Sequence, residues 1–479
     1  MINLILLTPL IFSAILFLNK NKSWYNIILS LSAVIQLVLS IFICCDITVL
    51  NKFELFNMFG STKIDKIFLM ILSIIYLAFV IYNLGYMKWD KSSTKRLRNY
   101  AFMVLMFIFS MTGAILSANL GLTWVFLEGA TLASAYLIYF YKTKHSIEAA
   151  WKYVFICSIG IALAFVGIIL LTVATGKFNS LNYTELYLNA KFFNPFWLKM
   201  SFVFILFGIG TKMGLAPLHF WLPDAYSQAP APVSALISAT LTNSAFLMIL
   251  KVFRILELAH CDNYARIMMF VMGFLSLFIA AVFVYHINNF KRMLAYSSIE
   301  NMGILIIGAA LGSIGLFASL IHLIGHSFIK AGFFMTGGNI SKLYGTKKIK
   351  SITGIISKDT KTGWLWVLSF LAISAFPPSI LFISEFLIVR TMLVKKYYII
   401  SLIFLFLLTI ILYGIGRAAI TMAFGNKKED EIDNEKQIRN LPWLMYFPQI
   451  VLIIGTFTLG LYMPKGFIDF VLTAIRTFN

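Results

Sequence analysis

The chain has 479 residues, of which 60% are hydrophobic and only 12% are charged, and its mean hydropathy is +0.88. Soluble domains contain about 45–50% apolar residues, so the composition excludes an ordinary soluble protein. The net charge of +20 does not indicate nucleic-acid binding, because the basic residues lie in the connections between apolar runs and form no single patch.

Apolar stretches of about 20 residues, the length that a transmembrane helix needs, follow one another along the chain. They predict an all-α polytopic membrane protein with about 14 transmembrane helices and no sizeable soluble domain. The first stretch lacks a basic n-region and a cleavage site, so we expect a retained span. The expected spans are 2–19, 23–44, 64–87, 99–118, 120–141, 147–173, 200–222, 232–256, 266–287, 293–312, 314–340, 363–392, 398–424 and 441–463, with a short apolar run at 467–478 on the surface.

Lysine and arginine are concentrated in alternate connections between these spans. Because cytoplasmic loops carry the excess of positive charge, both termini are predicted on the non-cytoplasmic side of the membrane. The longest polar interruption holds five acidic residues and is expected to be a solvated cytoplasmic loop. The basic connections are 20–22, 88–98, 142–144, 291–292, 342–361 and 427–439, and the acidic interruption is 426–440.

The four cysteines lie within or beside apolar stretches and show no CxxC spacing. They therefore predict neither an iron–sulfur cluster nor a zinc site. They are Cys44, Cys45, Cys157 and Cys261.

Ionisable residues inside apolar spans are costly, so each one marks a candidate functional site. The first is Glu128, whose small neighbours allow adjacent helices to approach closely. In the next span Glu148 and Lys152 are spaced i, i+4 and can pair along one helix face. Two interpretations of that pair stay open, a structural ion pair at the interface and a part of an ion path.

The span 200–222 combines a mid-membrane lysine, Lys212, with three glycines and Pro217. Proline removes a backbone donor and clashes with the preceding turn, so we expect the helix to break there. A break at membrane depth persists only inside protein or beside water. We predict a proton-carrying lysine at a discontinuous helix. The alternative is an anchor that snorkels to the membrane surface, but Lys199 and His219 already mark the two interfaces.

In the span 232–256, Asn243 and Lys251 are eight residues apart and share a helix face. Lys251 lies near the end of the span and is either an interfacial anchor or a proton-translocating residue. In the span 293–312, Glu300 follows a pair of serines that can hydrate it. Lys251 and Glu300 are both candidates for proton translocation.

The span 314–340 places His322, His326 and Lys330 at i, i+4 and i+8, which makes one polar stripe on an apolar helix. Neutral histidine accepts a proton on one nitrogen and donates from the other, so the stripe is typical of a proton relay. Zinc binding by the two histidines is the competing interpretation. No Asp, Glu or Cys in this helix completes a tetrahedral site.

The span 363–392 repeats the earlier arrangement, because Pro377 and Pro378 break it and Glu385 follows about two turns later. Two broken helices, each with a mid-membrane charge, are the pattern left by inverted structural repeats. The predicted units are the three N-terminal helices at 1–98, a first inverted repeat at 99–256, a second at 257–424, and a cytoplasmic loop, last helix and tail at 425–479.

Six segments occur in a characteristic order: LEGATLASA, EAAWKY, GTKMGLAPLHFWLPDAYSQAPAPVSALISA, AYSSIENMG, IHLIGHSFIKAGFF and FPPSILFISEF. In this the chain resembles the antiporter-like proton-pumping membrane subunits shared by respiratory complex I, multisubunit cation/proton antiporters and group 4 membrane-bound hydrogenases. The phrases SSIENMG and SKLYGTKKI look most like component F of hydrogenase-4 type complexes. Ser238, where complex I subunits usually carry histidine, adds to that likeness.

The resemblance implies fourteen helices, two inverted five-helix repeats and a central hydrophilic axis. It implies that Glu128 pairs with Lys212 in the first repeat. For the second repeat it implies proton-translocating histidines on the eleventh helix and a lysine or glutamate on the broken twelfth helix, which match His322, His326 and Glu385.

One position departs from the family pattern. Many relatives carry a lysine where this chain has Asn243, so the charge that they place at the centre of the relay is missing at this position. Lys251 and Lys330 are the lysines that would supply a charge nearby.

The resemblance implies a proton-translocating subunit of a redox-driven complex in a prokaryotic cell membrane, of the hydrogenase-4 or formate hydrogenlyase type. The sequence contains no cluster of metal ligands, no nucleotide-binding loop and no nucleophile with a matching base. We therefore expect no catalytic chemistry and no cofactor in this chain. A nickel–iron centre and iron–sulfur clusters are expected in partner subunits. The expected partners are other membrane and peripheral subunits, the lipid bilayer and protons, and not nucleic acid.

Three alternatives stay open. A sodium/proton antiporter subunit would use Glu128, Glu300 and Glu385 to ligate sodium, and a complex I-type subunit would serve quinone reduction. A passive scaffold is the third, but it does not explain the mid-membrane ionisable residues.

Overall fold

The computed structural model describes residues 1–18, 22–46, 58–89, 92–176, 178, 180–426 and 440–478. Most of the predicted acidic loop, 427–439, lies outside these residues. The helices are α1 (Ile2–Ile15), α2 (Lys22–Cys44), α3 (Lys63–Tyr86), α4 (Thr94–Leu116), α5 (Leu120–Ile138), α6 (Lys144–Thr175), α7 (Tyr183–Asn189), α8 (Pro195–Met213), α9 (Trp221–Gln228), α10 (Ala231–Leu258), α11 (Asp262–Val284), α12 (Phe290–Ala310), α13 (Ser313–Tyr344), α14 (Ile355–Lys358), α15 (Thr360–Ile373), α16 (Ile380–Val394), α17 (Tyr398–Phe424), α18 (Phe447–Leu461) and α19 (Lys465–Phe478).

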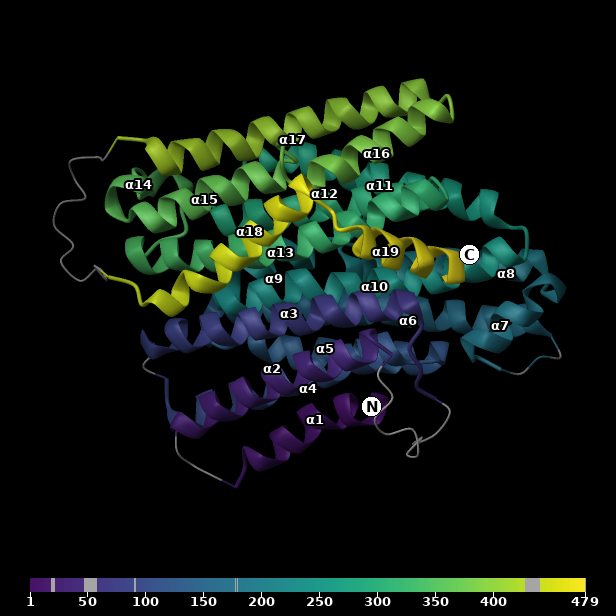
Figure 1. The fold of residues 1–479 in the computed structure, drawn as a ribbon, viewed down its shortest axis with the longest axis horizontal. Coiled ribbons are helices and arrows are strands. Elements are labelled where there is room, and N and C mark those ends of the chain that lie inside the picture. Colours follow the sequence, from purple (N-terminus) through teal and green to yellow (C-terminus); the bar gives the residue numbers. More distant parts are fainter. Residues whose placement is uncertain are drawn as a thin grey trace.

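The helices run alongside one another in a single bundle, with α1 at one edge, α17 at the other and α10 and α13 inside (Figure 1). Within the described residues, 12 helices are long and apolar enough to cross a membrane. This confirms the predicted all-α polytopic membrane fold. The predicted count of fourteen spans also includes α1 and the broken pair α15 and α16, which are shorter, so that count and the division into repeats stay predictions.

The three helices that carry most of the predicted polar residues are enclosed by the others. In α10 the apolar 18-residue segment that could cross a membrane is entirely buried, and in α13 it is 83% buried. In α2 and in α17 only 39% of the corresponding segment is buried. α13 packs against α10, α12, α16 and α18. The candidate residues on α10, α12 and α13 are therefore surrounded by protein and kept from lipid; they are Lys251, Glu300, His322, His326 and Lys330.

The predicted break in the seventh span lies between α8 and α9. α8 ends at Met213 because Gly214 adopts a left-handed conformation with φ of 85°, which glycine tolerates without strain. The groups freed by the break find partners inside the protein. Trp221 donates its indole N–H to the Thr211 carbonyl at 2.8 Å, and the Ala216 N–H donates to the Ser276 hydroxyl at 2.9 Å. The break therefore survives at membrane depth because neighbouring side chains satisfy its backbone.

The second predicted break separates α15 from α16. Ser379 caps α16 by accepting from the Phe382 N–H, and its hydroxyl donates to the Ala372 carbonyl at 3.2 Å. α18 closes this break from outside, because a Cβ atom on Gly460 would lie only 1.8 Å from the Pro378 carbonyl oxygen. Only glycine permits that approach.

The short apolar run expected on the surface forms α19. One face of α19 is buried against α3 and α13, so the run is partly enclosed by the bundle. The sequence predicted only a surface location because an amphipathic helix at a membrane interface and one docked on a bundle share the same pattern. The buried residues are Val471, Ala474, Ile475 and Phe478.

Candidate functional site

Lys212 lies in the last turn of α8, directly before the helix break, and its side chain has no exposed surface. Its Nζ lies 3.2 Å from the Glu128 carboxylate on α5 and also donates to the Thr131 hydroxyl on the same helix. The C-terminal end of a helix carries partial negative charge, which adds to the stabilisation of the ammonium. The snorkelling interpretation is wrong, because the side chain points into the protein. The Glu128–Lys212 pair that the family resemblance implied is present in the geometry.

Two contacts hold together α5, α6 and α8, the first and last of which carry this pair. A Cβ atom on Gly208 would lie 2.5 Å from the Gly160 carbonyl oxygen, so α8 and α6 pack with their backbones almost in contact. The hydroxyls of Tyr153 on α6 and Ser134 on α5 lie 2.7 Å apart and join these two helices. Glu128 differs from Lys212 in that 24% of its side chain is exposed. The glutamate side chain is therefore partly accessible at the protein surface, while the lysine is not.

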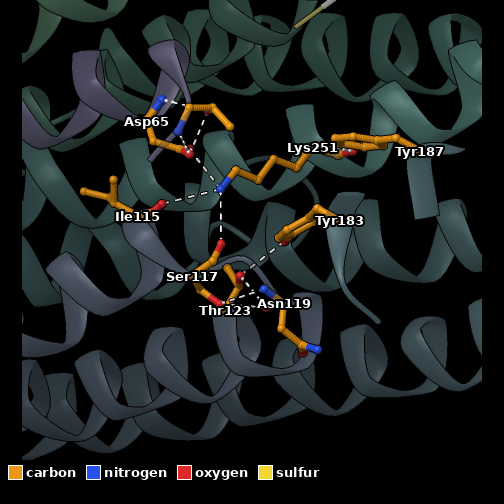
Figure 2. A network of polar contacts seen from close by, with 9 residues as sticks. Asp65, Ile115, Ser117, Asn119, Thr123, Tyr183, Tyr187 and Lys251 are labelled. Atoms are coloured by element: carbon orange, nitrogen blue, oxygen red, sulfur yellow. Dashed lines mark hydrogen bonds and ion pairs between the residues drawn. The ribbon is translucent and has the colours of Figure 1, made fainter. Parts of the chain in front are cut away.

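Lys251 forms a second buried ion pair, with a residue that the sequence reasoning missed. Its Nζ lies 2.9 Å from Asp65 Oδ1 on α3, and both side chains are at most 5% exposed. Figure 2 shows the ammonium at the centre of this network, with the carbonyls of Ile115 and Ser117 beside it. The side chain of Lys251 is therefore held inside the protein by an ion pair. Asp65 is the third residue of α3 and shares a capping box with Thr62.

Asn243 occupies the inner part of α10 and connects it to α13. Its amide Nδ2 donates to the Ser327 hydroxyl and to the Ala239 carbonyl, each at 2.7 Å. The position where many relatives carry a lysine thus holds a neutral hydrogen-bonded link here. Ser327 follows His326, so this link leads to the predicted histidine stripe.

The stripe on α13 is buried throughout, and its three members have different partners. His322 bonds through Nδ1 to the Ser384 hydroxyl at 2.8 Å and through Nε2 to Asn301 Oδ1 at 3.0 Å. Lys330 donates to the Leu294 carbonyl at 2.8 Å. Neither nitrogen of His326 has a hydrogen-bond partner within the described residues. His322 is therefore fixed between α12 and α16.

Glu300 on α12 and Glu385 on α16 line one cavity of about 280 Å³, which is bounded by α15, α16 and α17 and lined mostly by apolar side chains. Glu300 is buried and lies within electrostatic reach of Lys330 on α13. Ser384, the partner of His322, directly precedes Glu385. Glu385 is therefore the sequence neighbour of the α16 residue that contacts the α13 stripe.

Glu148 and Lys152 form the predicted i, i+4 pair at 2.6 Å, and both side chains are about half exposed. The lysine also contacts Asp224 on α9 at 3.2 Å, and Asp224 pairs with Arg292 on α12. Asp224 therefore links α6 to α12 through α9. The sequence reasoning did not single it out, because its partners lie on distant parts of the chain.

Two lysines from neighbouring segments donate hydrogen bonds to carbonyls at the C-terminal end of α9. Lys291 donates to the Ala229 carbonyl at 2.9 Å and Lys347 donates to the Ser227 carbonyl at 2.7 Å. Burial lowers the pKa of Lys347, which lies in the connection after α13, below that of an exposed lysine. The end of α9 is thus fixed by positive groups, as a helix C-terminus favours.

No three His, Cys, Asp or Glu side chains within the described ranges converge as a metal ion would require. Glu128 lies beside Lys212, while Glu300 and Glu385 line a separate cavity. The three carboxylates that the sodium alternative named therefore do not form one site.

The chain is similar to known membrane proteins over most of its length. The model of the family described as NADH:quinone oxidoreductase/Mrp antiporter, transmembrane, matches residues 117–412. The hydrogenase-4 component F homolog of Methylacidiphilum infernorum is 34% identical over 385 residues, 79% of either chain. A subunit of the Na(+)/H(+) antiporter of Bacillus subtilis is 26% identical over 379 residues, 78% of this chain and 76% of that one.

Among solved structures, a chain of the membrane-bound sulfane sulfur reductase, an archaeal respiratory membrane complex, superposes with a TM-score of 0.88. The alignment covers 100% of this chain and 97% of that chain at 21% identity. This likeness establishes the shared fold.

Proposed function

The chain belongs to the NADH:quinone oxidoreductase/Mrp antiporter family as an antiporter-like membrane subunit, and we propose that it translocates protons within a redox-driven complex of the hydrogenase-4 type. The membership confirms the family resemblance that the motifs indicated. The choice of complex is supported by the hydrogenase-4 component F homolog, which is more than 30% identical over most of both chains.

The observation that carries the proposal is the fully buried lysine at the helix break. Lys212 is paired with a carboxylate and a hydroxyl at membrane depth. A buried ammonium is stabilised by a nearby negative charge and destabilised by a positive one. Changing the charge beside Glu128, whose side chain is partly accessible at the surface, would therefore load or release the proton on Lys212. Proton transfer by this route needs no covalent chemistry in the chain.

A path for the proton continues through the enclosed helices. α10 packs against α8 and α13, and Asn243 joins α10 to α13 beside His326. The stripe then leads through His322 and Ser384 toward Glu385. The path thus begins at Glu128, beside the first broken helix, and ends at Glu385 in the second broken helix.

The redox chemistry is assigned to partners. We place a nickel–iron centre and iron–sulfur clusters in peripheral subunits, with further membrane subunits beside this one in a prokaryotic cell membrane. The relatives also include subunits of a sodium/proton antiporter and of an NADH-quinone oxidoreductase, so sodium exchange and a complex I-type role are the competing assignments.

Two substitutions at Lys212 test the proposal. Lys212→Ala removes the charge, and we expect the complex to assemble but proton uptake into reconstituted vesicles to fall by at least about tenfold. Lys212→Arg keeps the charge but effectively never releases its proton, so it should not restore uptake. Proton uptake at the parent rate by assembled Lys212→Ala complex would contradict the proposal.

A further inference from the structure

His219 lies in the connection between α8 and α9, the two halves of the first broken helix, where the sequence indicated a membrane interface. In the structure the residue is only 1% exposed, and neither nitrogen of its ring has a hydrogen-bond partner within the described residues. A neutral imidazole carries one donor and one acceptor, and leaving buried polar groups unpaired is costly. Packing alone therefore does not account for a histidine at this position.

The ring of His219 lies among aromatic side chains. Its centroid is 4.4 Å from that of the Phe220 ring and 6.3 Å from that of Tyr296 on α12, which meets it edge-on. The backbone carbonyl of His219 accepts from the Leu222 N–H at 3.0 Å. A phenylalanine ring would make the same ring contacts without leaving two nitrogens unpaired. What histidine adds here is the ability to accept and release a proton.

Tyr296 connects this ring to charged groups at the surface of the bundle. Its hydroxyl lies within electrostatic reach of Asp224 on α9 and Arg292 on α12, which pair with one another. Asp224 also contacts Lys152, whose pair with Glu148 is about half exposed. We call Glu148, Lys152, Asp224 and Arg292 the surface cluster. Tyr296 thus lies between His219 and groups that reach water.

The segment that carries His219 also packs onto the end of α8. Trp221, two residues later, donates its indole N–H to the carbonyl of Thr211, which directly precedes Lys212. Pro217 lacks a backbone N–H, and the last carbonyls of a helix have no intrahelical donor. Carbonyls freed at membrane depth are satisfied by protein groups or by water. The break therefore offers polar groups along the short way from His219 to Lys212.

We propose that His219 transfers protons between the surface cluster and Lys212. Its ring accepts a proton from water at one nitrogen and releases one to water at the other, and water at the break passes it to the Lys212 amine. One proton enters for each one that leaves, so the ring ends neutral. Because no described residue fixes the ring by a hydrogen bond, it can rotate back to the starting tautomer. The inference rests on the proposed function and names the residue that supplies Lys212 with protons.

The first test replaces His219 by phenylalanine in the full complex and follows proton uptake per assembled complex together with the thermal unfolding midpoint. His219→Phe keeps the ring contacts and removes the unpaired nitrogens, so the midpoint should be unchanged or higher. Uptake should nevertheless fall by at least about tenfold. The matched control is His286→Gln, at an exposed histidine between α11 and α12, which should keep the parent rate. Parent-rate uptake in His219→Phe, or lost uptake with a lower midpoint, would overturn the proposal.

The second test is rescue by free imidazole. His219→Ala leaves room for imidazole, which can carry the proton in place of the lost ring, whereas His219→Phe fills that space. With the same imidazole added to both, the initial uptake rate of His219→Ala should rise toward the parent rate and that of His219→Phe should not. An equal response in the two variants, or none in either, would overturn the proposal.

These results are separable from a failure of the proposed function. Proton uptake at the parent rate in Lys212→Ala would refute the proposed function itself. Lost uptake in Lys212→Ala with parent-rate uptake in His219→Phe would refute only the role of His219.

Discussion

At the scale of single residues, the lysine of the first broken helix and its carboxylate form the centre of the proposed path. Lys212 has no exposed surface, so its protonation depends on the few groups that touch it. Glu128 supplies the negative charge and Thr131 a hydroxyl acceptor from the same helix. A change at any of these groups should therefore alter proton loading more than it alters the fold.

Glu128→Gln should act on the same step as Lys212→Ala, because it removes the charge that favours the protonated lysine. We expect proton uptake to fall by about tenfold in Glu128→Gln. The double variant should then be little worse than the more impaired single variant, since residues that act as a pair are not additive. The measurement is vesicle proton uptake, normalised to assembled complex. Losses that multiply independently would show that the two residues do not work together.

The histidines on α13 give a second residue-scale prediction. His322 holds two hydrogen bonds, so His322→Ala should lower the stability of the complex by about 1 kcal/mol for each bond lost. His326 bonds to no described residue, so His326→Gln should leave the unfolding temperature unchanged. It should nevertheless impair proton uptake, because glutamine cannot carry a net proton. Normal uptake in His326→Gln would remove this residue from the path.

At the scale of helices, the two breaks are the features that position the charges. Both were predictable from the sequence, because proline deep inside an apolar span disfavours continuation of the helix. How each break is stabilised was not predictable. The indole of Trp221, the hydroxyl of Ser276 and the close approach of Gly460 come from segments whose contacts no local pattern specifies.

Trp221→Phe tests whether the first break must be held rigidly. The change removes one of two donors to the Thr211 carbonyl, which keeps the Gly214 N–H at 3.1 Å, and costs about 0.5–1.5 kcal/mol. We expect a lower unfolding temperature and reduced proton uptake, because Lys212 follows Thr211. The matched control is Trp366→Phe, which removes a buried indole bond to Ala419 away from this break. That variant should lose stability but keep the uptake of each assembled complex, and equal uptake losses in the two variants would refute the link between break and function.

At the scale of the whole molecule, the sequence predicted the membrane fold and the family but not the pairing of distant charges. The Glu128–Lys212 pair was implied by the family resemblance and not by any spacing. Asp65 was not predicted as a site residue, because it lies at the start of an apolar span, where charged residues are common. Its capping-box spacing from Thr62 was a visible signal, but its pairing with Lys251 depends on α3 packing against α10, which one sequence does not reveal.

The outer helices lead to a prediction about assembly. α2, α6 and α17 expose large apolar side chains to lipid or to other subunits, whereas the polar path is enclosed. We therefore expect the chain to co-purify in mild detergent with further membrane subunits and with peripheral subunits that carry nickel, iron and sulfide. Metal analysis and mass spectrometry of the purified complex measure this. Partners without nickel that reduce quinone would favour the complex I-type assignment instead.

The central claim is that electron transfer in the partners moves protons through Lys212 in this chain. The most direct test is the number of protons translocated per electron transferred, measured in vesicles for the parent complex and for Lys212→Ala at equal assembly. The proposed function predicts that this ratio falls in Lys212→Ala while electrons still reach the acceptor. An unchanged ratio in the variant would show that the protons move by another route and would contradict the claim.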